Sequence, residues 1–156
     1  MSLIPLAQTR RPHLHAITAA AFLGLTLALP PTPAASQEIE RPTLTIELNT
    51  VRQVDSACRL VFLTSNDLRY DLTAVAFETV LINRDGLVDR LTVFDFQDLP
   101  KDRQRVRQFD LADTDCTVLG QVLINGAVTC NSDDTQTDDC IDKLIVSTRT
   151  DVEISG

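Results

Sequence analysis

From residue 44 onward, apolar and polar positions alternate along most of the chain. Leu44, Ile46 and Leu48 alternate with polar neighbours, which is the period of a strand with one buried face. The same period predicts further strands at 58–64, 75–81, 88–96, 106–111, 122–124 and 144–154. The strand at 75–81 is apolar on both faces, so we expect it to be central and covered on both sides.

Turn-forming residues separate these strands. Asp85-Gly86 between two apolar runs is a strong hairpin signal, because glycine tolerates a positive φ. Pro100 lies in a polar break at 98–102. Asn125-Gly126 is expected to end the strand at 122–124.

Seven short strands in about 120 residues predict an all-β domain. An antiparallel β-sandwich fits this pattern best, with a closed barrel as the alternative. No segment after residue 36 has the pattern of a capped amphipathic helix. The odd-numbered step from Val106 to Phe109 predicts a β-bulge near Arg107 or Gln108.

Residues 1–36 have the three-part order of a secretory signal. Arg10 and Arg11 end a basic region, an uncharged apolar run covers 16–29, and a small-residue tail ends at Ser36. That run of 14 residues is shorter than the roughly 20 that a membrane-spanning helix needs. We therefore expect cleavage after Ser36 and a single periplasmic or secreted domain, 37–156, with no stable membrane insertion.

Two export routes fit the signal. Thr9, Arg10, Arg11 and Leu14 resemble a twin-arginine (Tat) signal, whereas Pro12 and the residue after it depart from that motif. An ordinary Sec signal whose basic region contains two arginines is the alternative, and the sequence leaves both routes open.

Removing this signal takes away two arginines and no acidic residue, so 12 basic and 22 acidic residues remain and the net charge is −10. Nucleic acid and anionic lipid both attract basic surfaces. The charge therefore argues against either as the main partner.

Four cysteines remain in the mature part: Cys58, Cys116, Cys130 and Cys140. An even number in an exported protein indicates two disulfides. Of the three possible pairings we favour Cys130–Cys140, which closes a short polar loop, together with Cys58–Cys116.

Both histidines lie in the signal, so the mature part lacks the usual base of serine and cysteine hydrolases and the commonest zinc ligand. No cofactor motif is present, and we expect no cofactor. A Ser-Lys hydrolase using Lys101 or Lys143 is the alternative that these residues leave open. These observations favour a protein that is not an enzyme.

Two polar segments are candidate binding sites. Arg103, Arg105 and Arg107 lie at a spacing of two, which places them on one face of an extended strand, where they could receive an unknown protein or an acidic ligand. In the acidic loop at 131–142, Asn131, Asp133, Asp139 and Asp142 partly follow the spacing of an EF-hand calcium loop. More ordinary interpretations are a charged strand edge and a solvated acidic loop.

The sequence also resembles known exported modules. The segments 94–100 and 105–111, with an Asp-Leu-Pro turn before a strand that ends in Phe-Asp-Leu, resemble immunoglobulin-like domains. Together with 58–60, the hairpin at Gly86 and 122–126, they resemble uncharacterised exported bacterial proteins labelled by a Tat-type signal sequence. This resemblance implies an immunoglobulin-like β-sandwich, and it implies no activity.

Three function hypotheses follow. The first is an exported, non-enzymatic binding or protein-interaction module of unknown partner, using the arginines at 103–107. The second is a calcium-dependent structural or adhesion module, and the third is a small hydrolase of unfamiliar type.

Overall fold

The computed structural model describes residues 41–133 and 135–156. The predicted signal at 1–36 lies outside these residues. Within them, no helix is long and apolar enough to cross a membrane.

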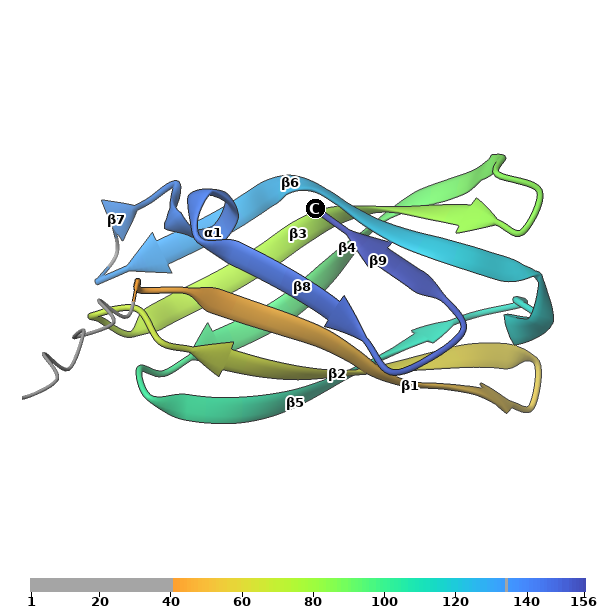
Figure 1. Cartoon of the computed structure of the whole chain (residues 1–156), viewed down its shortest axis with the longest axis horizontal. Helices are drawn as coiled ribbons and strands as arrows, with labels where there is room; N and C mark the ends of the chain where they lie inside the picture. The colour runs from red at the N-terminus through yellow and green to blue at the C-terminus, as the bar shows by residue number, and fades with distance from the viewer. Residues whose placement is uncertain (1–40, 134) are drawn as a thin grey trace, which may run out of the picture. The chain divides into compact units, whose positions relative to one another are not determined.

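In the described part of the chain, nine strands form two sheets (Figure 1). The first sheet has the order β5-β2-β1-β8, made of β1 (Leu44–Val54), β2 (Ala57–Asn66), β5 (Arg103–Leu111) and β8 (Leu144–Thr148). The second has the order β4-β3-β6-β7, with β9 also paired to β6, and consists of β3 (Leu72–Asn83), β4 (Val88–Leu99), β6 (Leu119–Ser132), β7 (Thr135–Gln136) and β9 (Glu153–Ser155). Two short helical turns are η1 (Cys116–Val118) and α1 (Asp139–Asp142).

The inner faces of the two sheets form one apolar core. Burial alternates strictly along β2, where Cys58, Leu60 and Phe62 are buried and their neighbours are partly exposed. Phe62 from the first sheet lies against Phe94 and Phe96 from the second, with ring centroids 6.0 Å and 5.5 Å apart. The all-β sandwich is thus confirmed, and two separate sheets replace the alternative of a closed barrel.

The expectation of purely antiparallel pairing is wrong at two places. The segment 144–154, predicted as one strand, is split between the sheets: β8 runs parallel to β1, and β9 runs parallel to β6. The hydroxyl groups of Thr148 and Thr150 accept bonds from the backbone N–H groups two residues later and so turn the chain, while Val152 is buried between the two strands.

Two further expectations are corrected in β5 and β6. The pairing of β5 with β2 is regular and has no bulge near Arg107 or Gln108, because Val106 lies on the outer face with its side chain exposed. Asn125-Gly126 does not end a strand. It forms a bulge within β6, which continues to Ser132.

Two disulfides hold the domain, Cys58–Cys116 and Cys130–Cys140. This is the favoured pairing. Two disulfides are typical of a protein that folds in an oxidising, extracytoplasmic environment.

Candidate functional site

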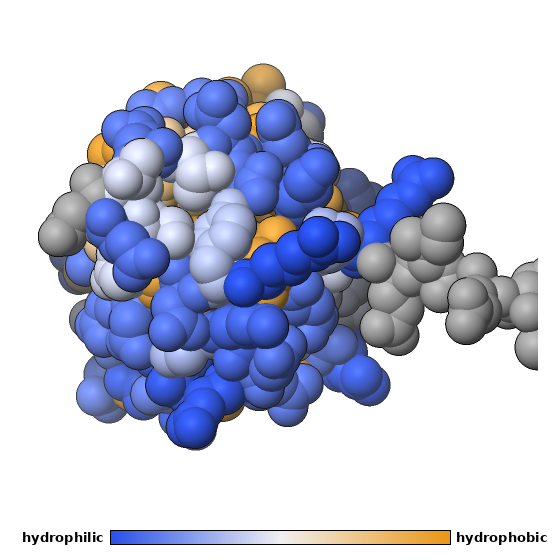
Figure 2. Space-filling view, turned by 90° about the vertical axis from the view of Figure 1, so that its left-hand side faces the viewer, coloured by the Kyte–Doolittle hydropathy of each residue, from blue (hydrophilic) through white to orange (hydrophobic). Residues whose placement is uncertain are grey.

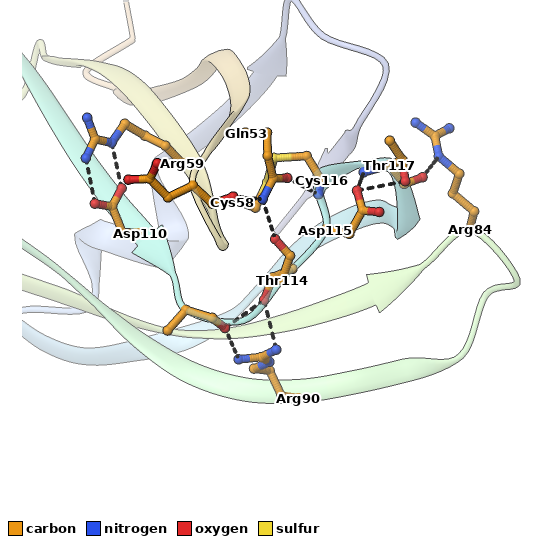
Figure 3. Close-up of a disulfide and its surroundings, with 12 residues drawn as sticks. Gln53, Cys58, Arg59, Arg84, Arg90, Asp110, Thr114, Asp115, Cys116 and Thr117 are labelled. Atoms are coloured by element: carbon orange, nitrogen blue, oxygen red, sulfur yellow. Dashed lines mark hydrogen bonds and ion pairs between the residues drawn. A yellow bond between two sulfur atoms is a disulfide. The ribbon is translucent and has the colours of Figure 1, made fainter.

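At one end of the sandwich, segments from three parts of the chain surround the Cys58–Cys116 disulfide (Figure 3). The bond ties β2 to η1 and thereby anchors the connection between β5 and β6. Gln53, near the end of β1, holds the same connection with both ends of its amide. Its Nε2 donates to the carbonyl of Thr114 at 3.2 Å, and its Oε1 accepts from the N–H of Cys116 at 2.9 Å.

Two arginines, one in the β3–β4 turn and one in β4, complete this anchoring. The Nε of Arg84 donates to the carbonyl of Thr117 at 2.7 Å, and its backbone N–H donates to Val118. Arg90 in β4 reaches across to the hydroxyl of Thr114 at 2.9 Å, and its Nε donates to Asp89 at the same distance. The segment 112–118 is therefore fixed from β1, β2, the β3–β4 turn and β4.

Asp115 caps η1 with its carboxylate. Oδ1 accepts from the backbone N–H and from the hydroxyl of Thr117, both at 2.8 Å. These two hydrogen bonds hold the pKa of the Asp115 carboxyl below its usual value, so the group stays ionised near neutral pH.

Between this segment and β4 lies a cavity of about 300 Å³. Its lining combines an apolar side with polar and charged groups: Leu81, Asn83, Asp89, Arg90, Asp113, Thr114, Asp115, Val118 and Leu119. We call it the β4 pocket.

The neighbouring strand β4 carries an exposed apolar strip. In the described part of the chain, nine large hydrophobic side chains are exposed, and four of them fall at 87–93. Val88, Leu91 and Val93 are 61%, 59% and 54% exposed. We call these three residues the β4 strip.

A bulge aligns the strip on one face. Val88 pairs with Ile82, Leu91 with Val80 and Val93 with Glu78, and the register shifts between the first two pairs. Without this shift at Asp89, strict alternation would turn Val88 to the opposite face from Leu91.

The strip continues onto the centre of the sheet. Val80 in β3 pairs with Leu91 on one side and with Leu123 of β6 on the other. β3 is central, as expected, but no third layer formed by residues 41–133 or 135–156 covers its outer face. Val80 is buried to 7% exposure by these two neighbours within its own sheet.

The predicted arginine stripe lies on β5, the edge of the other sheet. Arg103 is exposed, while the Arg107 side chain is only 16% exposed. The guanidinium of Arg107 donates to the carbonyl of Phe96 at 2.5 Å and to that of Asp98 at 2.8 Å. Arg105 lies 3.7 Å from the carboxylate of Asp98. Arg107 thus bridges the edges of the two sheets, and the hypothesis that the stripe binds a partner stays a prediction.

The acidic loop at 131–142 is bent by the Cys130–Cys140 disulfide. Asn131 lies in β6 and Asp133 in the following turn, while Asp139 and Asp142 lie in α1. Asp139 accepts a hydrogen bond from the hydroxyl of Tyr70 at 2.6 Å. Within 41–133 and 135–156, no group of three or more His, Cys, Asp or Glu side chains is placed to hold a metal. The calcium hypothesis stays a prediction.

The end of the domain that carries this loop is mainly hydrophilic (Figure 2). Tyr70, which the sequence leaves without a role, packs against the core and ties β2–β3 to α1. Burial and its bond to Asp139 raise the pKa of the Tyr70 hydroxyl.

Sequence reasoning missed the β4 pocket and the β4 strip. Val88, Leu91 and Val93 lie within the predicted strand at 88–96. The alternation of side chains along a strand, however, does not by itself show which face of the strand packs against the core. The pocket had no sequence signal, because its lining comes from segments that are distant along the chain.

The fold defines an all-β sandwich with two disulfides. The sequence matches no protein-family model and none of the curated proteins. A solved structure of IrmA from Escherichia coli is similar, with a TM-score of 0.55 at 12% sequence identity, over 68% of this chain and 92% of that one. At this identity the similarity extends to the fold alone.

Proposed function

We propose that this chain is an exported, non-enzymatic protein-interaction module that binds an extended segment of a partner along the edge of β4 at 88–94. The observation that supports this most directly is the β4 strip. Three aliphatic side chains lie exposed on one face of an edge strand. Exposed apolar edges of this kind recruit further strands.

In strand addition, backbone hydrogen bonds supply affinity and alternate side chains supply specificity. Side chains of an added strand that face outward would pack on Leu91 and Val93. The net charge of −10 after removal of residues 1–36 favours a partner segment with basic residues, because opposite charge speeds encounter.

The remaining expectations belong to this proposal. The two disulfides support an extracytoplasmic location, and the sequence pattern of 1–36 supports export to the periplasm or beyond. The immunoglobulin-like relationship is supported by the sandwich architecture. The Arg103–Arg107 stripe is kept as a secondary contact surface.

A random peptide library displayed on phage tests the proposed function without knowledge of the partner. Peptides selected on the mature domain should alternate apolar residues, and should slow hydrogen exchange of amides at 88–94. Binding should be lost in Leu91→Asp and Val93→Asp. It should be kept in the matched control Val106→Asp, which changes an exposed valine on the edge strand of the other sheet.

Two results would refute the proposal. One is selection of peptides that bind all three variants equally, and the other is protection of segments other than β4. A library that yields no enriched peptide would count against it as well.

A further inference from the structure

The β4 pocket opens beside the strand that the proposed function assigns to partner binding. Two of its lining residues, Asp89 and Arg90, belong to β4 and directly precede Leu91. The segment 112–118 contributes Asp113, Thr114 and Asp115 to the lining.

The direction of Arg90 shows which side chains of an added strand would meet the pocket. Arg90 pairs with the buried Leu81 and extends inward to Thr114, whereas Leu91 points outward. In an antiparallel pair, directly opposite residues share a face. A side chain opposite Arg90 would therefore point toward the pocket, and its two neighbours along the added strand would point outward toward the β4 strip.

The charges of the pocket favour a cation. Three aspartates, Asp89, Asp113 and Asp115, line it together with one arginine. Arg90 is already paired with Asp89 at 2.9 Å and bonded to Thr114. The carboxylates of Asp113 and Asp115 therefore leave the pocket with an excess of negative charge.

The apolar side of the pocket suits the stem of a long basic side chain. Leu81, Val118 and Leu119 provide this side. Lysine and arginine bury an aliphatic stem against apolar groups while their charged end remains among polar groups. Strands lie about 4.8 Å apart in a sheet, so such a side chain on an added strand is long enough to enter.

The pocket wall is fixed before any ligand arrives. The disulfide to Cys58, the two bonds from Gln53 and the bonds from Arg84 hold the segment 112–118 (Figure 3). A fixed wall reduces the ordering cost of binding.

From this geometry we infer that the β4 pocket selects a lysine or arginine side chain of the bound segment, between two apolar residues that pack on the β4 strip. The inference rests on the proposed function. Backbone hydrogen bonding at the edge of β4 would accept many sequences, and the inference specifies a basic residue at one position of the bound segment.

Asp113→Asn tests the pocket while preserving the backbone. Asp113 has φ of 51°, a left-handed conformation that asparagine also tolerates. The matched control is Asp102→Asn, because Asp102 has φ of 55° in the β4–β5 turn and does not line the pocket. Selection from the phage-displayed library is repeated on the mature domain and on both variants, at low salt.

Peptides selected on the unchanged domain and on Asp102→Asn should carry a basic residue flanked by apolar residues. Those selected on Asp113→Asn should keep the apolar alternation and lose the basic enrichment. For one selected peptide, replacing its basic residue by norleucine should weaken binding to the unchanged domain. Asp113→Asn should weaken binding of the basic peptide roughly two- to fivefold, the range of a partly exposed ion pair, and leave the norleucine peptide unaffected.

The outcomes separate the two proposals. Apolar alternation without basic enrichment, or equal binding of the basic and norleucine peptides, would overturn the pocket inference and leave the proposed function standing. Peptides that neither alternate nor protect β4 would overturn both.

Discussion

Arg107 is a charged residue that links the edge strands of the two sheets, β5 and β4. Its strand parity places it on the same side of β5 as the partly buried Phe109 and the buried Leu111. Two carbonyl groups at the edge of β4 accept its guanidinium hydrogens. An inward-pointing charge at a sheet edge also discourages edge-to-edge aggregation.

We expect Arg107→Ala to lower the free energy of unfolding by roughly 1–3 kcal/mol, because two hydrogen bonds from a charged group to backbone carbonyls are lost. The matched substitution Arg103→Ala, at an exposed position on the same strand, should change it by less than about 0.5 kcal/mol. Urea unfolding of both variants measures the difference, and equal effects would show that the bridge between the sheets is not stabilising.

Three surface carboxyls predict the response to acid. Hydrogen bonds from Arg149, Arg59 and the backbone of Thr117 hold the pKa values of Glu47, Asp110 and Asp115 below their usual values. Stability from a carboxyl with a lowered pKa is present above the pKa of the unfolded chain, about 4, and is lost as pH falls through the folded-state pKa.

The urea midpoint should therefore fall as pH is lowered from 5 toward 2. Asp110→Asn should make this fall shallower, because it removes the carboxyl that pairs with Arg59 through two contacts of 2.6 Å. An unchanged slope would mean that this pair does not contribute to the pH dependence.

Among the elements, strands with a regular pattern of apolar positions were predictable. The alternation of apolar and polar residues at 44–48 and 58–64 located β1 and β2, and the run at 75–81 that is apolar on both faces located β3. The short spacing of Cys130 and Cys140 suggested their pairing. The end of β6 was misplaced because Asn125-Gly126 can form a bulge as readily as a turn. The segment 144–154 was predicted as one strand because apolar and polar residues alternate along all of it, although β8 belongs to the first sheet and β9 to the second.

The connection between β5 and β6 depends on Gln53 in β1. We expect Gln53→Ala to accelerate hydrogen exchange at the amide of Cys116, since that N–H donates to the Gln53 side chain. Gln104→Ala, on the exposed face of β5, is the control and should leave this amide unchanged. Unaltered exchange in Gln53→Ala would show that the disulfide alone fixes the segment.

For the molecule as a whole, the two disulfides should differ in how much they stabilise the folded state. They close segments with sequence separations of 58 and 10. Because the loss of chain entropy grows with loop length, they should contribute roughly 4 and 3 kcal/mol. Replacing Cys58 and Cys116 by alanine should therefore lower stability more than replacing Cys130 and Cys140, as measured by the urea midpoints of the two variants. The reverse order would indicate that local packing around α1 outweighs loop length.

The pairing of β8 with β1 and of β9 with β6 also sets the order in which the two sheets form during biosynthesis. Leu44 pairs with Leu144, and Val122 pairs with Ile154, so both sheets await residues that the ribosome adds after all the other strands. A nascent chain halted before residue 144 would expose the unpaired side of β1. Both sheets are therefore complete only once the segment 144–155 has been synthesised, and a chaperone that shields β1 until then would raise the yield of folded protein.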